Sequence, residues 1–329
     1  MPSPAYSQPL FDLFRFARSG PARRDHLSPT EIRQIARTVR RTPEVMVKVL
    51  SKSANSLKAV RRHLGYIGRR GEIELETDDG EPLRGTQVGD DLLEDWDLTL
   101  DEYRRKSELT ATRGKEQARL IHKVIFSMPA GTPPDKVLSA VKNFIREEFA
   151  LKHRYVMALH TDEPHPHVHV VIKAMSEQGQ RLHIRKATLR EWRSEFARHL
   201  RELGVAANAT PRFVRGEANF RKPDGIYRAS LRGASTHMRV RAEAVALELA
   251  QGKRRIEPGK ASLLNTRNEV RRAWLALGDI LEREGQFELA AQIKQFISEM
   301  PPPLTERDWL AEKLGGKIRD KPRQQTSGR

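Results

Sequence analysis

The stretch His160-Thr-Asp-Glu-Pro-His-Pro-His-Val-His-Val-Val-Ile172 decides how this chain is interpreted, because it joins a hairpin signal to a histidine cluster. Residues 155–160 and 165–173 have the apolar, β-branched composition of strands, and Asp-Glu-Pro between them is typical of a tight turn. The pattern therefore predicts two neighbouring antiparallel strands.

Four of the eleven histidines lie within this stretch. Because side chains alternate along a strand, His165, His167 and His169 are predicted to share one face, with the intervening valines on the core face. The hairpin brings His160 back towards them. Converging neutral imidazoles suit Mn, Ni, Co or Zn, and Mg less easily. The alternative is a polar strand face with solvated histidines.

The surrounding pattern predicts an α+β fold in which helices pack on a central antiparallel sheet, because several strands are linked by short turns. The other expected strands are 45–50, 73–77 and 120–128. The expected helices are 56–70, 88–119, 133–149, 188–204, 236–251, 264–283 and 286–299.

Four regions are expected along the chain. They are a poorly packed extension over 1–44, a main domain over 45–215, a helical basic region over 216–314 and a disordered basic tail over 315–329.

Composition narrows the function classes. The 329 residues contain no cysteine, which excludes disulfide scaffolds, thiolate zinc sites and cysteine nucleophiles. No G-x-x-x-x-G-K-[S/T] loop supports an ATPase. A formal charge of +17 favours a polyanionic partner, usually nucleic acid. Without a signal-peptide or membrane-span pattern, we expect a cytoplasmic protein.

A second candidate site lies on the predicted helix over 56–70. Its buried stripe is Leu57, Val60, Leu64 and Ile67. Tyr66 falls on the opposite side of the helical wheel, among cations. A phenol is a poor nucleophile until it loses its proton, and nearby cations favour the deprotonated form. The cations expected to hold DNA phosphates are Lys58, Arg62, Arg69 and Arg70. A surface tyrosine packed on an arginine stem is the alternative.

Together these segments resemble the conjugative relaxases of the HUH endonuclease superfamily, closest to the mobilisation (MobP) branch that includes the Ti-plasmid border endonuclease. The similar stretches are 63–75, 122–131 and 160–172, in the family's order and spacing. The resemblance implies an HUH-type antiparallel sheet, Tyr66 as catalytic nucleophile and a divalent metal ion. The metal ligands that it implies are His160, His167 and His169.

The resemblance also implies roles near the site. Asp162 matches an acidic position that would orient a ligand histidine. His122 and Ser127 match a strand motif, where DNA contact, proton handling and a structural role remain open. His165, at the hairpin entrance between two prolines, is a further candidate.

The implied activity is strand-specific nicking and closing of DNA at an origin of transfer, through a 5′-phosphotyrosine intermediate. Implied partners are single-stranded DNA, accessory relaxosome proteins and a type IV secretion coupling protein, with export alongside DNA from the bacterial cytoplasm. A rolling-circle initiator or transposase of the same superfamily would use the same chemistry. A non-catalytic DNA-binding accessory protein and a metal-storage or structural metal protein are alternatives of other classes.

Overall fold

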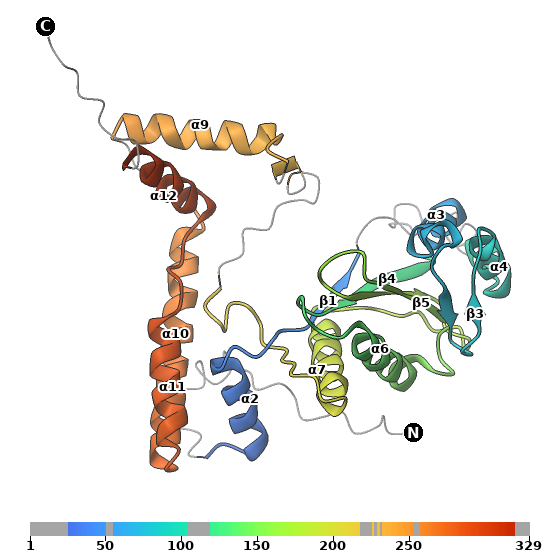
Figure 1. Ribbon diagram of the computed structural model, residues 1–329, viewed down its shortest axis with the longest axis horizontal. Helices are drawn as coiled ribbons and strands as arrows, with labels where there is room; N and C mark the ends of the chain where they lie inside the picture. Colours follow the sequence, from blue (N-terminus) through green and yellow to red (C-terminus); the bar gives the residue numbers. More distant parts are fainter. Residues whose placement is uncertain are drawn as a thin grey trace, which may run out of the picture. The chain divides into compact units, whose positions relative to one another are not determined.

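The computed structural model describes residues 26–50, 55–103, 119–217, 226, 229–230, 232–252 and 257–319. The chain divides into two compact units. The first comprises Arg41–Ala209, and the second combines the described residues before Arg41 with those from Thr210 onward. Figure 1 shows the elements of both units.

The first unit is built on a six-stranded sheet in which every neighbouring pair is antiparallel. Its strands are β1 (Met46–Val49), β2 (Leu75–Thr77), β3 (Pro82–Leu83), β4 (Ile121–Ser127), β5 (Tyr155–His160) and β6 (His167–Lys173). Their order is β1-β4-β6-β5-β2-β3, so the predicted hairpin strands lie near the centre. The prediction of an α+β fold on an antiparallel sheet is confirmed.

Helices cover both faces of this sheet (Figure 1). They are α3 (Leu57–Ile67), α4 (Val88–Asp95), α6 (Pro134–Phe149) and α7 (Lys186–Glu202). The aromatic core under α6 and α7 takes Val168, Val170 and Ile172 from β6, as expected. The histidine face is also covered, because α3 and α4 form a second core there that includes Val171.

The boundaries of two helices differ from the sequence-based expectation. Helix α7 begins at Lys186 rather than Thr188. The Thr188 hydroxyl accepts a hydrogen bond from the backbone N–H of Arg185, so it lies inside the first turn instead of capping it. Helix α4 ends at Asp95, and after a turn at Trp96 and Asp97 residues 98–103 are helical again, so the helix predicted over 88–119 is interrupted. Residues 104–118 of that prediction lie outside the described residues.

The second unit is helical and basic. Its helices are α2 (Pro29–Val39), α9 (Thr236–Ala250), α10 (Lys260–Arg283), α11 (Phe287–Ser298) and α12 (Glu306–Arg319). Helices α2, α10 and α11 share one apolar core. No helix in the described part of the chain is both long and apolar enough to cross a membrane.

Two expectations for the chain ends were wrong for the residues that the structure describes there. Residues 29–39 form a capped helix instead of a poorly packed extension, because Ser28 and Glu31 form a capping box and Ile35 is buried. Helix α12 continues to Arg319, inside the segment expected to be disordered. Residues 1–25 and 320–329 lie outside the described residues.

The turn after α3 depends on a single glycine. The helix ends at Ile67, and a 3-10 turn over Arg69–Gly71 follows. Gly71 has a φ of 96°, in the left-handed region that favours glycine. A Cβ at Gly71 would lie 2.6 Å from the backbone carbonyl carbon of Gly85, so the space is closed by main chain.

We predict that Gly71→Ala lowers the free energy of unfolding by about 1–3 kcal/mol, because alanine is strained at this φ and meets the Gly85 backbone. Gly65→Ala is the matched control, since Gly65 lies in α3 and a Cβ there would have no neighbour within 4 Å. The free energy of unfolding of Gly65→Ala should rise by up to about 1 kcal/mol, because alanine has a higher helix propensity than glycine. Urea denaturation of both variants measures the difference. A Gly71→Ala protein as stable as the native one would contradict this account.

Candidate metal and nucleophile site

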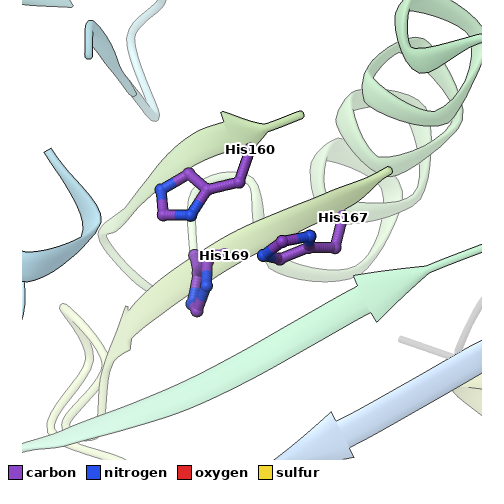
Figure 2. Close-up of side chains that lie close together, drawn as sticks. All are labelled: His160, His167 and His169. Carbon is purple, nitrogen blue, oxygen red and sulfur yellow. The ribbon is translucent and has the colours of Figure 1, made fainter. Parts of the chain in front are cut away.

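The three histidines His160, His167 and His169 come together on neighbouring strands. His160 on β5 is paired directly with His167 on β6, and His169 lies two residues further along the same face of β6. One ring nitrogen from each residue lies within 4.8 Å of the other two (Figure 2). His160 and His169 are buried, whereas His167 is half-buried at the strand end. We call these three residues the triad.

The hydrogen bonds of the triad determine which ring nitrogens carry a proton and which have a lone pair that could bind a metal ion. The Nε2–H of His160 donates to the carbonyl oxygen of Ile67 at 2.7 Å, and the Nδ1–H of His167 donates to the carbonyl oxygen of His165 at 3.0 Å. The Nδ1 of His169 is buried and has no hydrogen-bond partner in the described part of the chain. A buried imidazole nitrogen left unsatisfied in this way, in an all-nitrogen donor set, fits a divalent transition-metal ion.

Burial keeps His160 and His169 in the form that binds metal. It lowers the pKa of His160 and, together with the neighbouring imidazoles, lowers the pKa of His169 to about 3. Both rings are therefore neutral near pH 7, and each has one unprotonated nitrogen, the form that a metal ion binds.

Tyr66 lies beside the triad. The apolar side of α3 packs on the sheet through Val60, Leu64 and Ile67, and this places the Tyr66 ring centroid 5.9 Å from that of His169 and 6.5 Å from that of His160. Tyr66 is also 51% exposed, in agreement with the helical wheel. The phenol is therefore open to a large substrate while its ring contacts the candidate metal ligands.

Arg69 contacts both Tyr66 and the triad. Its guanidinium carbon lies 5.1 Å from the Tyr66 ring centroid, its Nη2 lies 3.2 Å from the Nδ1 of His160, and it forms an ion pair with Asp162. The prediction that Arg69 belongs to the same helix as Tyr66 was wrong, because α3 ends at Ile67. The left-handed turn, with φ of 49° at Arg69 and 57° at Arg70, brings the side chain back over the ring.

Sequence reasoning missed His63. Its ring stacks on Tyr66 with centroids 6.1 Å apart and meets His169 edge-on at 6.2 Å. Burial, assisted by the charge of Lys123, lowers the pKa of His63 to about 4. The signal was present in the spacing, since residues three apart on a helix are neighbours on its surface.

The supporting residues predicted near the triad have different places in the structure. Asp162 binds Arg69, and within the described residues this arginine links it to His160. Burial by itself would raise the pKa of Asp162, but a backbone hydrogen bond and Arg69 lower it overall. Ser127 is buried as the direct strand partner of His167.

Two of the predicted residues lie apart from the triad. The expectation that His165 shares the strand face was wrong, because Pro166 has no N–H for the ladder and β6 begins at His167. His165 is exposed and contributes its backbone carbonyl oxygen. His122 pairs with Ile172, on the sheet face that packs under α6 and α7, opposite the triad.

The remaining predicted cations are exposed on α3 and in the turn that follows it. Lys58 and Arg62 are exposed on α3, one turn apart, and Arg70 is exposed in the turn that follows. Tyr155, by contrast, is buried in the core under α6 and α7, and burial raises its pKa. Tyr66 is therefore the tyrosine that the fold presents beside the triad, among the residues that the structure describes.

Comparison with known proteins identifies the domain. Residues 75–205 match the nuclease domain of the MobA/VirD2-like relaxases. The chain carries a MobA/VirD2-like relaxase nuclease domain. The matched segment contains the triad, whereas Tyr66 precedes it, so the place of Tyr66 in the site rests on the geometry above.

The curated relatives of this relaxase domain are T-DNA border endonucleases VirD2. The protein of Rhizobium radiobacter is 26% identical over 193 residues, covering 53% of this chain and 43% of the relative. Those of Rhizobium rhizogenes and Agrobacterium fabrum are 26% identical over 138 residues, covering 39% of this chain and 30% of each relative. The chain thus spans less than half the length of these relatives. No solved structure matches it significantly.

We predict that the protein binds one divalent ion at the triad and that His167→Ala weakens binding by more than about 100-fold, because loss of even an outer hydrogen-bond partner costs 10–100-fold. His165→Ala is the control, since it keeps the backbone carbonyl that His167 contacts. Calorimetric titration with Mn²⁺ measures both variants. Equal weakening in the two would place the ion elsewhere.

We also predict that His122 makes the fold acid-sensitive. Burial lowers the pKa of His122 to about 4, although its Nε2–H donates to the carbonyl of Leu182. The unfolded chain binds this proton near its ordinary pKa of about 6.5, so stability is lost as the pH falls from about 6.5 to 4.

The loss attributable to His122 should reach up to about 3 kcal/mol. His122→Gln keeps a donor for Leu182 and removes the titration. Denaturation curves across this pH range should show a smaller decline for the variant. Identical declines for the two proteins would contradict the prediction.

Proposed function

We propose that this protein is a metal-dependent relaxase that nicks and rejoins single-stranded DNA at an origin of transfer, with Tyr66 as nucleophile. The observation that carries the proposal is the exposed Tyr66 ring 5.9 Å from His169 of the triad. An exposed phenol beside a candidate metal site is the arrangement that phosphoryl transfer to tyrosine requires.

The chemistry would proceed by in-line displacement. The Tyr66 oxygen loses its proton and attacks the scissile phosphorus, the bond to the 3′ oxygen breaks, and that oxygen leaves as a 3′-hydroxyl after taking up a proton. The 5′-phosphate remains joined to Tyr66 as a phosphotyrosine ester. A 3′-hydroxyl can later attack this ester and rejoin DNA without ATP, because the reaction exchanges one phosphodiester for another.

The triad residues His160, His167 and His169 would hold the metal ion. When bound, the ion withdraws charge from the non-bridging oxygens of the scissile phosphate. Mn or Mg is the ion we expect in use, with Zn, Ni or Co as other occupants that an all-imidazole site accepts.

The cations around Tyr66 would position the DNA. Lys58 and Arg62 are exposed on the helix that carries Tyr66, Arg70 is exposed in the turn after it, and each could neutralise a backbone phosphate. Binding to Z phosphates of a single strand gives a log–log salt slope of about −0.7Z. Arg69 would add a contact at the reacting phosphate, next to Tyr66.

The catalytic region would extend over residues 45–215. The region over 216–314 would bind further DNA or the relaxosome proteins. The basic tail over 315–329 would act as a signal for export through a type IV secretion channel, with its coupling protein as the partner. In that role the protein acts in the bacterial cytoplasm and leaves with the transferred strand. Two observations support these assignments. Residues 212–255 are basic, with eleven Lys or Arg against four Asp or Glu, and residues 75–205 match a relaxase nuclease domain.

We predict that Tyr66→Phe abolishes the covalent protein–DNA adduct while changing DNA affinity less than about twofold, because only the nucleophilic oxygen is removed. A labelled oligonucleotide carrying the element's own transfer origin, with Mn²⁺ or Mg²⁺, is the substrate. Tyr103→Phe is the matched control, since Tyr103 is 74% exposed and should retain full activity.

Denaturing gel electrophoresis detects the adduct. An adduct that survives in Tyr66→Phe would refute the assigned nucleophile. Tight, salt-dependent DNA binding by the native protein with no adduct would instead support a non-catalytic accessory protein.

A further inference from the structure

We propose that the guanidinium group of Arg69 and the metal ion compete for the same nitrogen of His160, so that metal binding moves Arg69 from the triad to the DNA phosphate. This inference deepens the proposed function and rests on the proposed metal site. It assigns Arg69 a role that the other cations near Tyr66 do not share.

The hydrogen bonds of His160 identify the contested atom. A carbonyl oxygen only accepts, so the contact with Ile67 at 2.7 Å requires the proton on Nε2 of His160. A guanidinium only donates, so its contact at 3.2 Å requires the lone pair on Nδ1. The nitrogen of His160 that is free to bind a metal ion is therefore the one that Arg69 covers.

Arg69 is held in this position from three sides. Asp162 pairs with its Nη2, the face of Tyr66 lies 5.1 Å from its guanidinium carbon, and the left-handed turn before Gly71 directs the side chain inward. Its side chain is only 28% exposed. By contrast Arg70, the next residue, is exposed and makes none of the contacts described for Arg69 at the triad.

One lone pair cannot serve both cations. A metal ion on Nδ1 of His160 removes the acceptor of Arg69 and adds a like charge next to its guanidinium, so the arginine leaves the ring. The N–H groups released in this way suit a phosphate oxygen, which accepts paired guanidinium hydrogen bonds well. Metal binding thus makes Arg69 available to the DNA phosphate, next to the Tyr66 phenol that attacks this phosphate.

The first test measures Mn²⁺ affinity by calorimetry in the absence of DNA. Arg69→Gln should bind Mn²⁺ at least about fivefold more tightly than the native protein, because a coupling between two ligands of one site is of this order or larger. Arg70→Gln should change the affinity less than about twofold. The tighter Mn²⁺ binding of Arg69→Gln should persist between 0.1 M and 0.5 M salt. If the variant bound more tightly only because it lacks a long-range repulsion between the arginine and the ion, salt would screen that difference.

The second test uses the native protein and does not depend on a variant that folds. Phenylglyoxal modifies accessible arginines, and mass spectrometry of the digested protein reports each site. Mn²⁺ should raise the modification rate of Arg69 severalfold while leaving that of Arg70 unchanged.

The outcomes separate the two proposals. If neither the native protein nor Arg69→Gln binds Mn²⁺, the proposed metal site fails and the competition fails with it. If both bind Mn²⁺ equally and Arg69 keeps its modification rate, the metal site stands and the competition is overturned.

Discussion

The antiparallel pairing of His160 with His167 is the constraint on which the site depends. It places imidazoles from two strands opposite each other and sets His169 on the same face, next to Ala158. A shift of this register by one residue would turn every histidine of β6 into the core under α6 and α7. The apolar residues that alternate with the histidines oppose that shift, since they fill the other face.

Helix α3 adds the nucleophile to this face through ordinary apolar packing. Val60, Leu64 and Ile67 are buried against the sheet, and the Ile67 carbonyl accepts the hydrogen bond from His160. The same packing that stabilises the fold thus sets the distance from Tyr66 to the triad and the orientation of one imidazole. The Gly71 turn then returns Arg69 to the phenol, so nucleophile, cation and imidazoles form one continuous set of contacts.

Much of this was predictable because alternation and helical periodicity are local properties. They identified the hairpin, its cluster of histidines and an exposed Tyr66, whereas the resemblance to a family selected His160, His167 and His169 from that cluster. The errors have tertiary causes. Pro166 ends the ladder before His165. The role of His122 was left open, and its pairing with Ile172 places it on the sheet face opposite the triad. Arg69 reaches the site through a turn with positive φ, which residue type alone does not reveal. His63 carried a spacing signal that was overlooked.

The central claim is that the oxygen of Tyr66 becomes bonded to DNA, and mapping the covalent adduct tests it most directly. Tryptic cleavage after Arg62 and Arg69 releases residues 63–69, a peptide whose one tyrosine is Tyr66. Tandem mass spectrometry of nuclease-trimmed adduct should place the nucleotide on this peptide, joined to Tyr66 through its 5′-phosphate. A nucleotide on another residue, or one joined through its 3′-phosphate, would contradict the account.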